Sequence, residues 1–94
     1  MTVNAELEKI AERLGLPFQA EIEDSRVETA LLARLPLAFA RGNLLLPLRE
    51  EDGRLLVAVA DPANLLVLDE VRGVFGMPVQ GVVVPREALL EAVN

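Results

Sequence analysis

Three consecutive carboxylates, Glu50-Glu51-Asp52, form the densest cluster of potential ligands in the chain. Hard cations such as Ca²⁺ prefer carboxylate oxygens, but the spacing does not match the loop of an EF-hand. The cluster leads into Gly53, and exposed hairpin tips commonly carry such solubilising charge. No further acid is placed near it that could serve as a partner in acid/base catalysis. We therefore predict neither a metal site nor a catalytic site here.

Residue types that support other catalytic chemistry are almost absent. The chain has no Cys, His or Tyr, and its hydroxyl side chains are Thr2, Ser25 and Thr29. A hydroxyl nucleophile would lack an imidazole base, and zinc sites with nitrogen or sulfur ligands are excluded. No Gly-x-x-x-x-Gly-Lys-Ser/Thr loop occurs, so the chain cannot itself be a P-loop ATPase. The sequence predicts no catalytic residue and no cofactor.

Arg13-Leu14-Gly15 has two interpretations. It can be the end of a helix, where Arg13 complements the helix dipole and Gly15 takes a left-handed conformation. It can also be a phosphate site, with Arg13 beside a backbone that a nucleotide can approach closely. On the residues alone we favour the helix end.

Length and charge limit the remaining function classes. Ninety-four residues form one small domain with a single core, which must be aliphatic because 52% of residues are hydrophobic and only 3% are aromatic. The net charge of −6 argues against nucleic acid as a partner. The longest apolar runs have five or six residues, and the N-terminus lacks a hydrophobic signal region. These features predict a cytoplasmic chain with no direct membrane insertion.

The N-terminal part of the chain must supply mainly helices. Apolar residues at i, i+3, i+4 and i+7 predict a helix from about residue 4 to 14, with Leu7, Ile10, Ala11 and Leu14 on one face. Alternating residues predict an extended segment over 17–22. A capping-box pattern predicts a second helix that starts at Ser25. Pro36 then opens another turn or two that should stop at Gly42 in a left-handed conformation.

The centre of the chain reads as a β-hairpin over 44–49 and 54–60. Its second run has no polar residue on either face, which predicts a central strand with Leu56, Val57 and Val59 buried. Pro47 in the first run indicates an edge strand. A helix that begins at Pro62 and ends at Gly76 should bury Leu65, Leu68, Val71 and Phe75.

The remaining residues complete a small three-stranded sheet. A third strand near 79–84 should lie parallel to the central strand, because a helix connects the two. A last helix opens at Pro85, with Leu89, Ala92 and Val93 directed inward. We predict an α/β fold in which this sheet is packed with four to five helices in one domain over 1–94.

Several segments together are similar to a known family. The chain resembles the N-terminal domain of type II secretion and type IV pilus assembly ATPases, GspE-like proteins, over nearly its whole length. The motifs that carry the resemblance are Leu14 to Phe18, Leu35-Pro36 with Ala40-Arg41, Pro47-Leu48, Val57 to Asn64, and Leu68 to Glu70.

The resemblance implies a non-catalytic regulatory and docking domain, cut from a longer ATPase whose motor domain follows it. Its implied partners are that motor domain and the cytoplasmic domain of an inner-membrane platform protein, which would hold the ATPase peripherally at the inner membrane. Arg26, Arg34 and Arg41 are candidate partner-binding residues. The resemblance also implies an alternative, cyclic di-GMP binding, for which Arg13, Leu14 and Gly15 match the first three letters of a longer motif. The helical continuation of that motif is missing.

Overall fold

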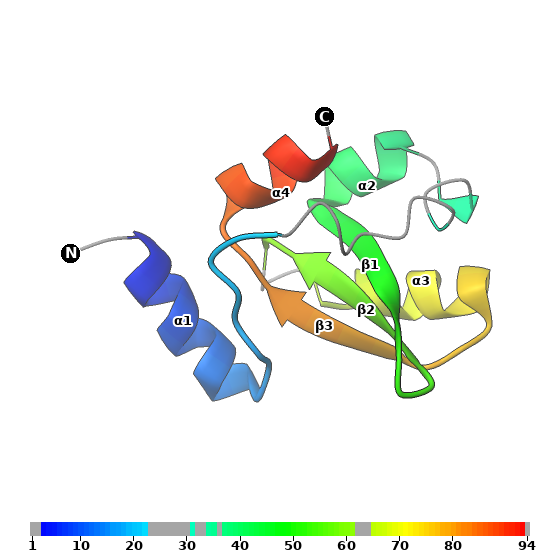
Figure 1. The fold of residues 1–94 in the computed structure, drawn as a ribbon, viewed down its shortest axis with the longest axis horizontal. Coiled ribbons are helices and arrows are strands. Elements are labelled where there is room, and N and C mark those ends of the chain that lie inside the picture. The colour runs from blue at the N-terminus through cyan, green and yellow to red at the C-terminus, as the bar shows by residue number, and fades with distance from the viewer. Residues whose placement is uncertain (1–2, 23–30, 32–33, 36, 62–64, 94) are drawn as a thin grey trace.

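The computed structural model describes residues 3–22, 31, 34–35, 37–61 and 65–93. In these ranges three strands form one sheet and four helices surround it (Figure 1). The elements in chain order are α1 (Val3–Leu14), α2 (Leu37–Asn43), β1 (Leu45–Glu51), β2 (Arg54–Val59), α3 (Val67–Phe75), β3 (Val79–Val83) and α4 (Arg86–Val93). The predicted α/β architecture is confirmed, and the predicted helix at Ser25 lies outside the described residues.

β2 is the central strand, as its uniformly apolar sequence predicts. The strand order is β1-β2-β3, with β1 antiparallel and β3 parallel to β2. Asp52 and Gly53 turn the hairpin with φ angles of 55° and 78°, the positive values that a tight turn of this kind requires. Pro47 lies on the edge strand as predicted, and the register shifts directly after it, between Pro47 and Arg49.

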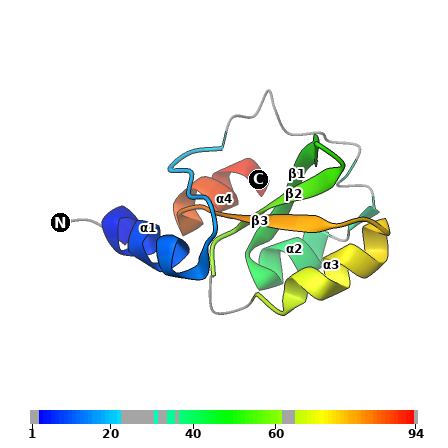
Figure 2. The ribbon, with the colours of Figure 1, turned by 90° about the horizontal axis from the view of Figure 1, so that it is seen from below.

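Both faces of β2 are covered, so its side chains alternate between two apolar clusters. Val57 and Val59 are 0% exposed in the cluster shared with α2 and α3, and Leu56 is 8% exposed in the cluster shared with α4. Figure 2 shows α2 and α3 on one side of the sheet. Burial of these side chains on both faces is what allows a strand without polar residues to be stable in water.

The segment after α1 closes the outer edge of β3. Gly15 has a φ of 72°, and the following Leu16 donates its N–H to the carbonyl of Ala11 at 2.9 Å. Val83 then donates to the Pro17 carbonyl and accepts from the Gln19 N–H, both at 2.9 Å. The predicted extended segment therefore forms an isolated parallel β-bridge between Phe18 and Val83, which protects part of the sheet edge.

Two predicted helix boundaries are wrong. α2 continues through Gly42 to Asn43, and the left-handed residue is Leu44 with a φ of 52°. The sheet explains this position, because the Leu44 carbonyl accepts a hydrogen bond of 2.9 Å from Ala60 at the end of the central strand. The Asn43 side chain donates to the Phe39 carbonyl at 3.0 Å and satisfies that helical carbonyl.

α3 begins at Val67 and not at Pro62. Leu65 and Leu66 form a tighter turn, in which their carbonyls accept from Leu68 at 3.0 Å and Asp69 at 3.1 Å. Val67, which the predicted stripe omitted, is 7% exposed, whereas Leu65 and Leu68 are only half-buried. The helix ends at Gly76 as predicted, with a φ of 67°.

Candidate functional site

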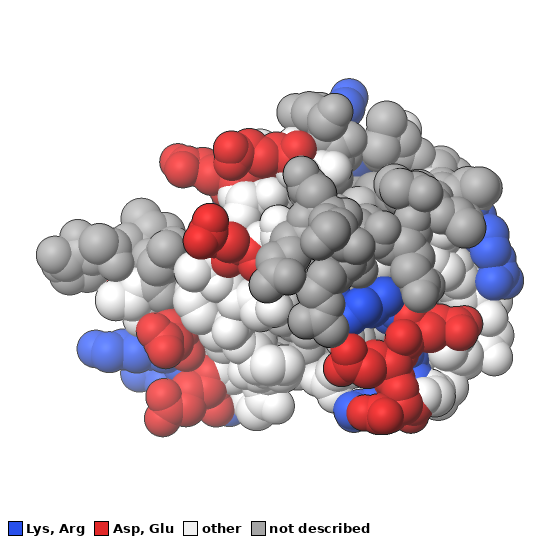
Figure 3. Space-filling view, viewed as in Figure 1, with Lys and Arg blue, Asp and Glu red and all other residues white. Residues whose placement is uncertain are grey.

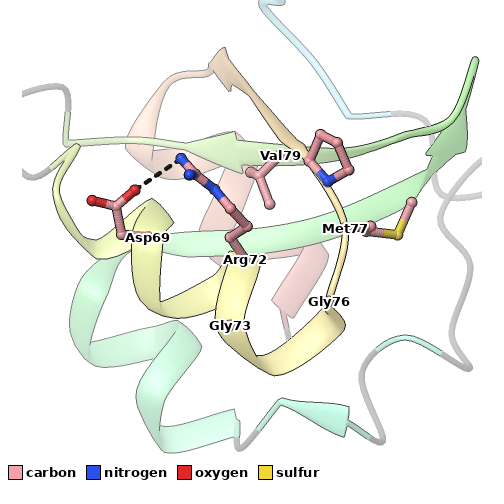
Figure 4. Close-up of a pocket in the computed structure, with 7 residues that line it drawn as sticks. Asp69, Arg72, Gly73, Gly76, Met77 and Val79 are labelled. Atoms are coloured by element: carbon pink, nitrogen blue, oxygen red, sulfur yellow. Dashed lines mark hydrogen bonds and ion pairs between the residues drawn. The ribbon is translucent and has the colours of Figure 1, made fainter.

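A cavity of about 620 Å³ lies at the C-terminal end of α3, where the chain turns into β3 (Figure 4). The residues that line it are Asp69, Arg72, Gly73, Gly76, Met77, Pro78 and Val79. Gly76 closes the helix by donating its N–H to the Arg72 carbonyl at 2.7 Å, and the left-handed turn leads the chain directly into Met77 and Pro78. The cavity therefore combines apolar side chains with a polar rim.

The polar rim is a single exposed ion pair. Arg72 donates from Nη2 to Oδ1 of Asp69 at 2.9 Å, one helical turn apart. Their side chains are 59% and 66% exposed, so water screens the pair and its contribution to stability is small. The cavity offers a surface for recognition, with Arg72 already neutralised by Asp69, and not a desolvated pair of catalytic groups.

Arg34 lies beside the same end of α3. Its guanidinium is 4.7 Å from the centre of the Phe75 ring, and its Nη2 donates to the Val74 carbonyl at 3.1 Å. A cation at this place also complements the C-terminal end of the helix dipole. Arg34, predicted as a partner-binding residue, is thus engaged in a fold contact that its position in the sequence did not indicate.

Arg41 is the other predicted partner-binding residue that the structure describes. Arg41 is exposed in the last turn of α2. Arg26 lies outside the described residues. The structure therefore places Arg34 against α3 and Arg41 on α2, and the partner-binding role of the three arginines stays a prediction.

Arg13-Leu14-Gly15 forms the end of α1. Arg13 is exposed in the last helical turn, and Gly15 donates its N–H to the Glu12 carbonyl at 3.1 Å. This geometry matches the helix-end interpretation of the motif.

A second cavity, of about 370 Å³, includes Gly15 but not Arg13. Its guanidinium groups come from the hairpin: Arg49 pairs with Glu51 at 3.1 Å, and Arg54 donates to Gln80 Oε1 at 3.2 Å. The hydrogen-bond partner of Arg54 is thus neutral, although Glu51 lies opposite Arg54 in the hairpin and lines the same cavity. The cavity brings Arg54 to Gly15, the backbone position that the nucleotide hypothesis singled out. Sequence reasoning missed Arg54, because only the folded chain brings the hairpin next to Gly15.

The acidic residues at the hairpin tip are exposed, as Figure 3 also shows for the red side chains over β1 and β2. Within the described ranges no three acidic side chains converge as metal ligands. None of the described helices is long and apolar enough to cross a membrane.

Comparisons with known proteins agree on one family. The model of the MshEN domain matches residues 14–94. The type IV pilus assembly ATPase PilB of Myxococcus xanthus (strain DK1622) is 25% identical over 85 residues, which cover 90% of this chain and 15% of PilB. The chain thus spans only a small part of that relative.

Solved structures show the same fold. The N-terminal domain of XpsE is 28% identical with a TM-score of 0.74, covering 96% of this chain and 64% of the XpsE chain. A structure described as MshE with cdg is 23% identical with a TM-score of 0.78, covering 99% of this chain and 67% of the other. The chain therefore belongs to the MshEN domain family, as an N-terminal domain of the kind carried by type II secretion and type IV pilus assembly ATPases.

Proposed function

We propose that this domain is a regulatory and docking module that couples an ATPase motor to an inner-membrane assembly platform. The observation that carries the proposal is the match of fold and sequence to the N-terminal domain of XpsE over 96% of the chain. On this proposal the partners are the cytoplasmic domain of a platform protein and an ATPase domain in the same polypeptide. The domain itself contributes binding and no catalysis.

The exposed side of α3 supports a docking role. Leu66, directly before α3, is 82% exposed, and Val74 within α3 is 45% exposed, although the helix packs its other side into the core. The 620 Å³ cavity opens between this helix and β3. Exposed apolar side chains on a helix that also borders a cavity are compatible with a surface that binds another protein.

A binding assay with purified components tests the proposal. The domain is titrated against immobilised cytoplasmic domains of candidate platform proteins, and we expect binding that Leu66→Asp and Arg41→Glu weaken. Arg86→Glu is the matched control for Arg41→Glu, because Arg86 is also an exposed helical arginine but lies on α4 and is not a predicted partner-binding residue. Arg34→Lys retains the charge but weakens the contact with Phe75, which separates a fold role of Arg34 from a binding role.

Two results would contradict the proposal. The docking role is wrong if the domain binds none of the platform domains under conditions in which full-length relatives do. The non-catalytic assignment is wrong if the isolated domain hydrolyses ATP.

Cyclic di-GMP binding is the second candidate function. The cavity beside Gly15 favours it, because Arg49 and Arg54 supply guanidinium groups that suit phosphate oxygens. A tight site would also need an aromatic side chain that is free to stack on guanine. All three Phe rings of the chain are used by the fold: Phe75 is 7% exposed, Phe39 packs against the core, and Phe18 is half-buried next to Val83.

A further inference from the structure

α1 carries an apolar stripe that the described molecule covers on one side only. Ala11 is 1% exposed, whereas Ile10 and Leu14 are 38% and 44% exposed and Leu7 is half-buried. Figures 1 and 2 show that α1 extends from one end of the sheet, with its N-terminal part away from the strands. The family model begins only at residue 14, so α1 lies almost entirely outside the part that defines the family.

The stripe has the spacing of a coiled-coil seam. Leu7, Ile10 and Leu14 are separated by three and four residues, as at the a and d positions of a heptad. Glu6 and Arg13 each directly precede a seam leucine and lie seven residues apart, so both are on the same flank of the seam. Ala11 lies on the opposite flank, which is the one that the domain covers.

The free flank carries opposite charges at its two ends. Neither Glu6 nor Arg13 forms an ion pair within the part of the chain that the structure describes. Figure 3 shows acidic and basic side chains next to one another over α1. A partner helix of uniform charge would be attracted at one end of this flank and repelled at the other. A second copy in antiparallel orientation matches both ends.

We propose that α1 is a self-association element in which two copies of the chain pair through antiparallel α1 helices. Leu7 of each copy packs against Ile10 of the other, and Glu6 of each copy meets Arg13 of the other. The contact is isologous, so every interaction occurs twice. In a parallel pair, the flank with Glu6 would instead face the flank with Ala11 of the other copy. The domain covers that flank, and Ala11 carries no positive charge that could pair with Glu6.

The predicted dimer is weak. Two three-turn helices bury less than the roughly 1,200 Å² at which stable protein interfaces begin. We expect a dissociation constant from about 10 μM to about 1 mM for the 94-residue chain. Tethering the domain to a larger assembly would raise its effective concentration and favour the pair.

Charge reversal and charge exchange test the inference. Sedimentation equilibrium of the 94-residue chain is expected to show dimerisation that Glu6→Arg and Arg13→Glu each weaken at least about fivefold, because each reversal acts at two symmetry-related pairs. The double variant Glu6→Arg/Arg13→Glu exchanges the charges and is expected to restore dimerisation. Glu12→Arg and Lys9→Glu make the same charge changes on the far side of α1 and should leave the dissociation constant within about twofold.

Ile10→Asp removes the apolar centre of the seam and should abolish the dimer, while circular dichroism checks that every variant remains folded. The inference is overturned if the chain is monomeric up to about 1 mM, if Ile10→Asp still dimerises, or if the exchanged double variant fails to recover what the single reversals lose. Because the assay contains only this chain, its result is independent of the proposed docking function.

Discussion

Gly81 is a position on β3 where a side chain would not fit without movement. A Cβ built there would be 3.2 Å from Leu68 Cδ1, 3.7 Å from Val59 Cγ2 and 3.8 Å from Leu16 Cδ1. We expect Gly81→Val to lower the free energy of unfolding by about 1 to 3 kcal/mol, because its two methyl groups would overpack this contact between α3 and the sheet. Urea denaturation measures the change.

Gly73 provides the matched control on the facing helix. It lies in α3, is exposed, and nothing would come within 4 Å of an added Cβ. Gly73→Ala should therefore stabilise the domain by about 0.5 to 1 kcal/mol, since alanine loses less backbone entropy than glycine on folding. If neither substitution changed the free energy of unfolding, the close contact between Gly81 and Leu68 would be absent from the domain in solution.

The contact between Arg34 and Phe75 is of a kind that the sequence did not predict. Arg34 was predicted to be a partner-binding residue, and the sequence contains no signal that places it over Phe75, a residue 41 positions later. Such a contact depends on where the segment before α2 crosses α3, which is a property of the tertiary structure. The helix-ending glycines Gly15 and Gly76 were predictable, because a left-handed residue at a helix end is a local requirement.

At the level of elements, β2 should be the most protected part of the chain against hydrogen exchange. It pairs on both sides, and its side chains from Leu55 to Val59 are at most 8% exposed. We expect the amides of 55–59 to exchange slowest and those of the hairpin tip, Glu50 to Gly53, to exchange fastest among the strands and turn of the hairpin. Exchange measured by NMR would contradict the central position of β2 if 55–59 were as fast as the tip.

Sheet order and strand direction could be predicted because they rest on strong local signals. An apolar run without polar residues, an Asp-Gly turn, a proline in the edge strand and a helix between two strands leave few alternatives. The end of α2 and the start of α3 were mispredicted because a competing interaction decided each of them. Leu44 is placed by its bond to Ala60, and α3 is delayed by the turn at Leu65 and Leu66. The cavity beside Gly15 escaped prediction because it joins the hairpin to the end of α1.

The charge of the whole molecule bears on the cyclic di-GMP hypothesis. A dianionic ligand would approach a chain of net charge −6. The arginines that line the cavity beside Gly15 are Arg54 and Arg49, and Arg49 is already paired with Glu51. We therefore expect no binding of cyclic di-GMP tighter than about 10 μM. Titration calorimetry on the isolated domain measures this constant.

If cyclic di-GMP binds tightly, two variants show which arginine the binding depends on. A submicromolar constant that Arg13→Ala abolishes would show that the shortened Arg13-Leu14-Gly15 motif suffices, against our expectation. One that Arg54→Ala abolishes would place the ligand in the cavity that the hairpin forms. Arg86→Ala, which removes an exposed arginine on α4, controls for the general loss of positive charge.

The bonds from Pro17 and Gln19 to Val83 also set an order of events during synthesis. A ribosome releases the chain from its N-terminus, so the hairpin of β1 and β2 can form while β3 is still unmade. Until residue 83 has emerged, the segment at 17–19 has no strand to pair with, and the central strand exposes one row of amide and carbonyl groups. The nascent domain therefore passes through a stage with an unpaired strand edge, when another chain could add to it. When β3 emerges, it covers that edge of β2 and also pairs with the segment at 17–19.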